Sequence, residues 1–274
     1  MWTLTTFLYE IDRQTMPNIY RRSMTDMREK LSRIAQQLRD TDCCMRVYCD
    51  DTETYHAMKM FPRVEVVMKP LNDWPIYAQE HKFQDIVSRV TSPRYPQDFS
   101  RHYSMAVLSK IDALLETAAL YPTHTHMWMD AGYRWSVADL RAPNWTSVSK
   151  VYIPCKRFPL ETKRRMFGGV WGGSTRSLLT LKNTFDEMVP SVIAEGLPFT
   201  EETVMMRVYD KYPSLIYPVD LHSMGPFPQG NLSDMVKFMV KGDAHVVLRH
   251  HFSTIDVAVA ALLLVCVVAL AYSK

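Results

Sequence analysis

The sequence predicts an α/β protein in which helices flank a mostly parallel central sheet, followed by a C-terminal transmembrane helix. Three observations lead to this prediction. Between residues 3 and 219, segments rich in strand-forming residues alternate with segments that have helical periodicity. Strands and helices alternate in this way in α/β proteins with a parallel sheet. Hydrophobic residues make up 47% of the 274 residues and charged residues 22%, which is enough apolar material for a substantial core. Residues 257–272 contain no charged side chain.

The strand and helix signals follow one another along the chain. Strands are expected at residues 3–9, 45–49, 64–68, 126–129, 151–153, around 170 and at 214–219. Helical faces are expected over residues 27–38, 108–118 and 178–192, with loops and short helices over 70–103. Parallel sheets bind ligands at the carboxyl ends of their strands. Asp50, Asp51 and Asp130 each follow such a run and are therefore candidate site residues.

Composition and missing motifs exclude several function classes. The 32 basic and 29 acidic side chains leave a net charge of +3, too little to favour a nucleic-acid-binding surface. Five cysteines at unpatterned positions are typical of a reducing compartment. The sequence contains no P-loop, dinucleotide-binding glycine motif, HExxH or GxSxG, which argues against the corresponding hydrolases and dehydrogenases.

The uncharged segment predicts a helix that spans a membrane. Residues 257–272 would extend about 24 Å as a helix, and residues 255 and 256 bring the segment closer to the ~30 Å hydrocarbon core. A buried core helix is the alternative. We expect a folded domain over residues 1–250 and a single-pass anchor over 255–272. The position of the segment at the C-terminal end implies a tail anchor with the folded domain in the cytosol, and the N-terminal residues lack the features of a signal peptide.

The first segment that indicates chemistry is MWMDAGY, residues 127–133, in which an apolar strand ends at one carboxylate. A carboxylate at such a position suits a divalent ion bound to a diphosphate. The alternative is that Asp130 caps a turn.

The second segment is FGGVWGG, residues 167–173. Its glycines allow close approach of a substrate, and Trp171 could stack on a sugar ring or a base. A tight hairpin with a core tryptophan is the alternative.

The third segment is FTEETVMM, residues 199–206, where Thr200 is expected to cap a helix that begins with Glu201 and Glu202. These acids are candidate catalytic groups, or only partners of the helix dipole.

In this order the segments resemble the HtrL/YibB family of glycosyltransferase-like proteins. TLTTFLYEIDR is similar to that family's opening strand and tyrosine–acid–glycine–arginine motif, with Asp12 in place of the glycine. RHYSMAVLSKIDALL resembles the helix before the metal strand, MWMDAGY the tryptophan–Asp–Ala–Gly signature, and FGGVWGG the glycine-rich segment. FTEETVMMRVYDKYPSLIYPV is similar to the closing turn, helix and strand. The resemblance spans about residues 3–220.

The resemblance implies a glycosyltransferase A-type fold that binds a nucleotide sugar with Mn²⁺ or Mg²⁺. Asp130 would hold the metal and the diphosphate, with His222 as a candidate second metal ligand. Gly132 stands where the second acid of an Asp-x-Asp motif is usual. Arg13 and Lys110 are candidate phosphate partners.

The remaining roles complete the hypothesis. Asp50 or Asp51 would contact the base or ribose, and Glu201 or Glu202 would act as the base or orient the acceptor. Trp171, Gly172 and Gly173 would shape the acceptor side. We expect a hexosyltransferase-type enzyme that moves a sugar from a nucleotide-sugar donor to a hydroxyl of a glycan, lipid or protein. The alternative is an inactive, membrane-bound interaction protein of the same fold, which Asp12 and Gly132 favour.

Overall fold

A computed structural model describes residues 1–11, 23–93, 95–131, 150–157 and 164–220. The chain divides into two compact units, Met1–Gly225 and Pro226–Lys274, and all described residues belong to the first. Among them, no helix has both the length and the apolar character needed to cross a membrane. Residues 255–272 lie outside the described residues, so the membrane helix and the domain boundary at 250 stay predictions.

An eight-stranded sheet forms the centre of the first unit. Its strands are β1 (Trp2–Leu8), β2 (Cys43–Cys49), β3 (Val64–Met68), β4 (Thr125–Met129), β5 (Val151–Arg157), β6 (Arg164–Met166), β7 (Val170–Ser174) and β8 (Ile216–Asp220). The order is β3-β2-β1-β4-β7-β5-β6, with β8 also paired to β5. Pairing is parallel from β3 to β4 and between β5 and β8, and β7 runs antiparallel to β4 and β5. The predicted mostly parallel α/β sheet is therefore confirmed.

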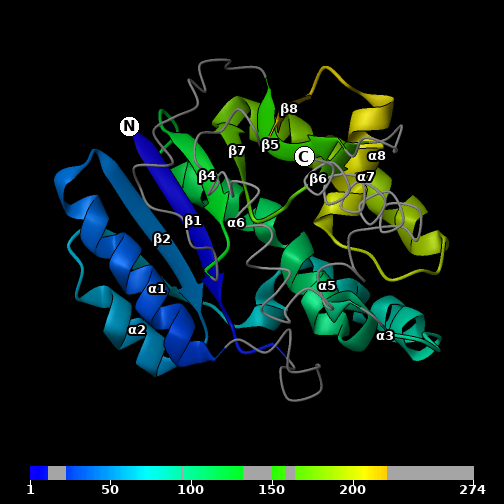
Figure 1. Cartoon of the computed structure of the whole chain (residues 1–274), viewed down its shortest axis with the longest axis horizontal. Coiled ribbons are helices and arrows are strands. Elements are labelled where there is room, and N and C mark those ends of the chain that lie inside the picture. Colours follow the sequence, from blue (N-terminus) through cyan, green and yellow to red (C-terminus); the bar gives the residue numbers. More distant parts are fainter. Residues whose placement is uncertain (12–22, 94, 132–149, 158–163, 221–274) are drawn as a thin grey trace, which may run out of the picture. The chain divides into compact units, whose positions relative to one another are not determined.

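Helices cover both faces of this sheet, as Figure 1 shows for α1 beside β1 and β2 and for α6 behind β1 and β4. The α-helices are α1 (Met24–Gln37), α2 (Thr52–Lys59), α3 (Glu80–Ser88), α4 (Pro96–Phe99), α5 (Arg101–Leu108), α6 (Lys110–Leu120), α7 (Thr175–Ala194) and α8 (Glu201–Lys211). Short 3₁₀ helices occupy η2 (Leu38–Asp40), η3 (Leu71–Asp73) and η4 (Pro75–Gln79).

Two hydrophobic cores follow from the alternation of side chains along the strands. Met127 and Met129 of β4 join the core that α1 and α2 cover, whereas Trp128 between them joins the core beneath α6 and α7. The core beneath α6 and α7 contains a cluster of aromatic side chains. In this cluster the ring centre of Phe7 lies 4.7 Å from that of Trp128 and 5.2 Å from that of Trp74. Its large rings bury much apolar surface directly beneath the carboxyl ends of β1 and β4.

The structure departs from two expected helix features. The helical face expected over residues 108–118 is divided at Ser109, which ends α5 and precedes α6. The Ser109 hydroxyl donates to the Met105 carbonyl at 2.9 Å and so competes for a backbone acceptor. Thr200 stands at the start of α8 as expected, but its side chain makes no capping hydrogen bond.

Gly172 allows β7 to enter the middle of the sheet. It pairs with Met127 of β4 on one side and with Tyr152 of β5 on the other. A Cβ atom at this position would overlap the His126 carbonyl oxygen and lie 2.8 Å from the Met127 Cα. Both obstacles are backbone atoms, so no side-chain rotation could relieve the overlap.

We predict that Gly172→Ala lowers the free energy of unfolding by about 3 kcal/mol, the upper range for overpacking a closed site. Denaturant titration of the variant measures this. The matched control is Gly196→Asn, because Gly196 has a φ of 70° in open space and asparagine tolerates that conformation. A Gly172→Ala protein as stable as the control would contradict the prediction.

Candidate functional site

The centre of the candidate site is the ammonium group of Lys110, at the first turn of α6. Its side chain is only 5% exposed. The Nζ atom donates to a carboxylate oxygen of Glu201, lies 2.9 Å from Asp130 Oδ1, and donates to the Gly168 carbonyl at 3.1 Å. An ammonium has three N–H donors. All three are engaged, so Lys110 holds this site together and has no donor left for a phosphate group in this conformation.

Three further segments bring their groups to Lys110. Asp130 follows β4, Gly168 lies in the turn between β6 and β7, and Glu201 and Glu202 open α8. Trp128 Nε1 donates to Asp130 Oδ1 at 2.7 Å, because residues 128 and 130 lie on the same side of the strand. The Gly168 N–H donates to Glu202 Oε1 at 2.6 Å. The structure thus brings Lys110, Asp130, Glu201 and Glu202 together, and the roles predicted for them stay predictions.

Gly168 is required by this packing. A Cβ there would overlap the Glu201 carboxylate, which reaches across the turn to Lys110. The neighbouring Gly169 carbonyl accepts the Asp130 N–H at 2.8 Å, so the turn is tied to β4 as well as to α8.

Burial and charge act on the ionisable groups of the site in opposite directions. Burial raises the pKa of Glu201 to about 7, Lys110 acts to lower it, and Glu202 and Asp130 raise it further. Burial likewise raises the pKa of Glu202, whereas the hydrogen bond from the Gly168 N–H acts to lower it. Burial acts to lower the pKa of Lys110, but Asp130 and Glu201 outweigh burial and raise it. The site therefore contains one ammonium and a set of carboxyl groups that compete to be ionised.

Asp130 is a carboxylate of this cluster that solvent can reach. Its side chain is 37% exposed, against 4% for Glu201. Lys110 and Trp128 both bind Oδ1, and within the described residues no hydrogen bond to Oδ2 is found. Asp130 is thus held in one orientation with its second oxygen available to a ligand.

Asp50 and Asp51 lie at the same edge of the sheet, after β2. Asp50 is exposed, two strands away from Asp130. Asp51 caps α2, accepting the Thr54 N–H at 2.7 Å, and its Oδ1 lies 3.6 Å from an Arg28 guanidinium nitrogen. Of the two, Asp50 is the residue placed to meet a ligand, and Asp51 has a structural role.

A metal centre is not assembled by the described residues, which contain no group of three His, Cys, Asp or Glu side chains able to hold an ion. Arg13, Gly132 and His222 lie outside the described residues, so their predicted roles are untested.

The glycine-rich segment is placed inside the sheet. Trp171 has none of its surface exposed and packs in the core beneath α7. A Cβ at Gly173 would lie 3.0 Å from the Lys150 carbonyl oxygen. Trp171, Gly172 and Gly173 therefore match the core-tryptophan alternative better than an acceptor platform.

Sequence reasoning missed Tyr103, Trp128 and Gly168. Tyr103 of α5 precedes Lys110 by seven residues, or two helical turns, and that spacing was the available signal. Burial raises the pKa of Tyr103, which is also affected by the charges of Lys110, Glu201 and Asp130.

Comparison with known proteins finds similarity among solved structures. No protein-family model matches the sequence, and no curated protein does. Among solved structures, the chain is similar to the galactosyltransferase LgtC, whose crystal structure contains donor and acceptor sugar analogues. The TM-score is 0.49 at 8% sequence identity, over 78% of this chain and 72% of that chain.

We predict that Lys110→Met destabilises the protein by about 3–5 kcal/mol at pH 8, because it leaves buried carboxylates without their partner. Since burial raises the pKa of Glu201 to about 7, the folded state binds this proton more tightly than the unfolded chain. Stability therefore falls as pH rises from the unfolded pKa of about 4.3 to about 7. Lys110 acts to lower the pKa of Glu201, so without Lys110 the loss of stability continues to higher pH.

Thermal unfolding at pH 5 and pH 8 measures the difference. The control is Lys211→Met, which removes an exposed lysine 2.7 Å from Glu187 and should change stability by less than about 1 kcal/mol. An equal loss for Lys110→Met at both pH values would contradict the predicted titration of Glu201.

Proposed function

We propose that this chain is a glycosyltransferase that moves a hexosyl group from a nucleotide sugar to an acceptor hydroxyl. The observation that carries the proposal is the arrangement of Asp130, a solvent-accessible carboxylate fixed at the carboxyl end of a parallel strand by Lys110 and Trp128. Such edges are where open α/β sheets bind their ligands. The ordered resemblance of the four sequence segments to glycosyltransferase-like proteins supports the chemistry.

The donor would lie along the edge formed by β2, β1 and β4. Asp50 and Asp130 are separated by two strand spacings, roughly 10 Å. That separation suits a nucleotide sugar whose base or ribose contacts Asp50 and whose diphosphate end lies near Asp130. Neither residue is used in capping a helix or closing a turn elsewhere in the described residues.

Glu202 is the proposed general base. Its residue surface is not completely covered, it lies next to Asp130 and Glu201, and burial raises its pKa, which favours a carboxyl group that can take up a proton. The Gly168 N–H binds one of its oxygens and holds the carboxylate in place. Glu201 is a positioning residue, because its carboxylate is buried against Lys110.

A divalent cation at Asp130 would stabilise the leaving diphosphate. The described residues contribute one oxygen to such an ion, Asp130 Oδ2, and do not complete a metal site. Metal dependence is therefore proposed from the resemblance alone, and no step is assigned to the ion. Assays with Mn²⁺, Mg²⁺ or a chelator test it separately from transfer itself.

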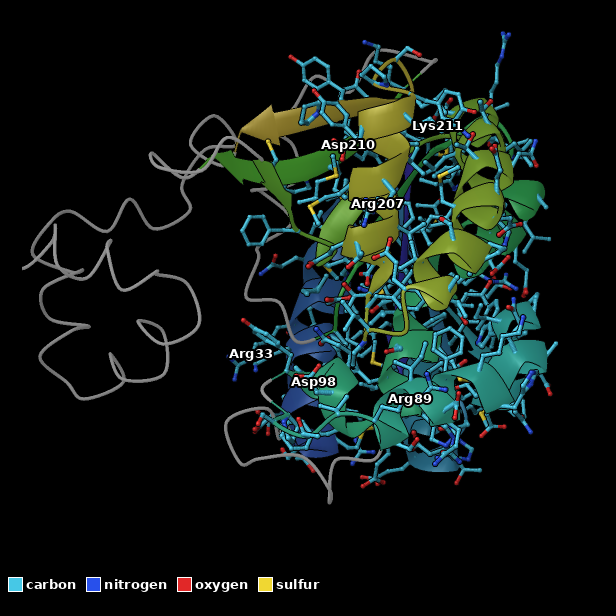
Figure 2. The ribbon with its side chains drawn as sticks, turned by 90° about the vertical axis from the view of Figure 1, so that its right-hand side faces the viewer. Arg33, Arg89, Asp98, Arg207, Asp210 and Lys211 are labelled. Atoms are coloured by element: carbon cyan, nitrogen blue, oxygen red, sulfur yellow. The ribbon has the colours of Figure 1, made fainter. Side chains whose placement is uncertain are left out.

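The test of transfer is a panel of nucleotide sugars assayed with the wild-type chain and Asp130→Asn. Asparagine keeps the oxygen that accepts from Lys110 and Trp128 but loses the charge. We expect transfer or hydrolysis of one donor, reduced by about 100-fold or more in the variant. The matched control is Asp210→Asn, which removes an exposed aspartate from the same helix as Glu201 and Glu202 (Figure 2) and should leave the rate unchanged.

Two outcomes would contradict the proposal. Full activity in Asp130→Asn would remove Asp130 from the reaction. No turnover by the wild type, together with no shift in melting temperature on adding nucleoside diphosphates, would favour the inactive interaction protein. A binding nucleotide at one hundred times its dissociation constant would stabilise the fold by about 2.7 kcal/mol, which is readily measured.

We also propose that residues 255–272 attach the protein to a membrane. Deleting residues 255–274 is then expected to move the protein from the membrane pellet to the soluble fraction, because the uncharged segment is removed. Fractionation of cells that express both forms measures this. A deleted chain that stays in the pellet would contradict the proposal, and a full chain in the supernatant would do the same.

A further inference from the structure

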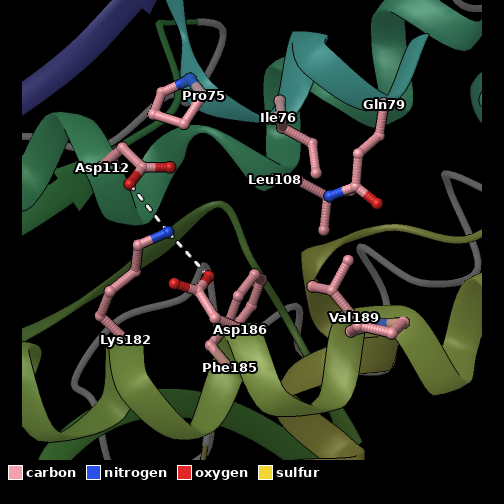
Figure 3. Close-up of a pocket in the computed structure, with 10 residues that line it drawn as sticks. Pro75, Ile76, Gln79, Leu108, Asp112, Lys182, Phe185, Asp186 and Val189 are labelled. Carbon is pink, nitrogen blue, oxygen red and sulfur yellow. Dashed lines mark hydrogen bonds and ion pairs between the residues drawn. The ribbon is translucent and has the colours of Figure 1, made fainter.

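A second concave site lies between the α5–α6 junction, α7 and η4 (Figure 3). The pocket has a volume of about 190 Å³. An apolar cavity of about 150 Å³ accommodates benzene, so this pocket has room for one small ring. Lys110 and Asp112 are two residues apart on α6, which places them on different faces of the helix. The pocket is therefore separate from the Asp130 cluster.

One wall of the pocket is apolar. Leu108, Phe185 and Val189 are each at most 4% exposed and belong to the hydrophobic core, and Ile76 packs against them. A ligand that fits here needs an apolar body.

Another part of the lining is charged. Lys182 Nζ lies 2.8 Å from Asp112 Oδ1 and 2.7 Å from Asp186 Oδ1 (Figure 3). The carboxylates of Asp112 and Asp186 and the ammonium of Lys182 together have a net charge of −1 when all three are ionised. The side chain of Asp112 is only 16% exposed, and its burial raises its pKa. With both carboxylates ionised they outnumber the Lys182 ammonium, so this part of the pocket favours a cation over an anion.

The proline inside α7 leaves a backbone carbonyl without its helical donor. Pro190 in α7 has no N–H, so the carbonyl of Asp186, four residues earlier, lacks its helical donor. Both residues line the pocket. Gln79 of η4 also lines the pocket, and its side-chain oxygen is an acceptor suited to a group with several N–H donors.

We propose that this pocket binds a small organic ammonium ion, with its apolar body against Phe185 and Val189 and its charged group at Asp112. The occupant is defined by its chemistry: a primary amine on a body no larger than about one aromatic ring. This proposal does not depend on sugar transfer, so a test of amine binding and a test of sugar transfer can give independent results.

The first experiment compares three probes of one shape on the full chain: benzylammonium, benzyl alcohol and benzoate, at matched ionic strength. Binding is followed by calorimetry and by the shift in melting temperature. For a ligand of this size we expect a dissociation constant on the order of 1 mM for the amine. The alcohol should bind at least about tenfold more weakly, and benzoate should not bind. Equal binding of amine and alcohol, or no binding of the amine, would overturn the proposal.

The second experiment removes the internal cation. Lys182→Ala leaves Asp112 and Asp186 without a partner, so the variant should melt at a lower temperature than the wild type. Benzylammonium should restore more of the lost stability than it adds to the wild type, whereas benzyl alcohol should not. The matched control is Lys211→Ala, which breaks an exposed ion pair with Glu187 on the same helix α7. Equal rescue of both variants would contradict binding in the pocket.

A third variant tests the location without altering any charge. Val189→Phe adds bulk to the apolar wall and is expected to abolish the calorimetric signal of benzylammonium. Because this variant keeps the ion pairs, it decides the proposal even where Lys182→Ala does not fold. Unchanged affinity in Val189→Phe would place the amine elsewhere and overturn the proposal.

Discussion

The buried ammonium of Lys110 is the interaction on which the arrangement of the site depends. A cation removed from water is tolerated only with close partners that replace its hydration. Lys110 finds them in Asp130, Glu201 and the Gly168 carbonyl, which come from three segments remote in the sequence. The positions of β4, the β6–β7 turn and α8 around α6 are therefore coupled, and a shift in any of them would leave a charge unpaired.

The same constraint separates the carboxyl groups by role. Glu201 is paired with Lys110 and almost completely covered, so it is suited to holding the cation and poorly suited to meeting a substrate. Asp130 shares the cation but keeps part of its surface in solvent, and Glu202 is held by a backbone N–H. Three neighbouring acids thus differ in burial and in partners, which is how one site can give chemically similar groups different roles.

Much of the fold and part of the site could be predicted from the sequence. β3 occupies the residues expected for it, and β1, β2 and β4 lie within two residues of theirs, because apolar runs of β-branched and sulfur-containing residues end at clear boundaries. Lys110, Asp130, Glu201 and Glu202 were each selected from separate segments, and they meet.

What could not be predicted is which of these residues is buried and what its neighbours are. Lys110 is expected to face a phosphate if it is exposed, and it becomes an internal cation only because α8 covers it. Similarly, the sequence fits a loop that faces a substrate as well as it fits a buried strand at Trp171, Gly172 and Gly173. The pairing of β7 with β4 and β5 decides for the strand. Both differences arise from long-range packing, which local patterns do not encode.

Helix α6 joins the two sites in one rigid element. Its first turn contains Lys110, directed at the carboxylates near Asp130, and Asp112, directed at Lys182 in the pocket against α7. Both residues are ion-paired to groups on other elements, and α6 itself packs against β1 and β4. Ile111 and Leu114 of the same helix belong to the hydrophobic core. The close packing that fixes α6 on the sheet therefore fixes the positions of Lys110 and Asp112 together.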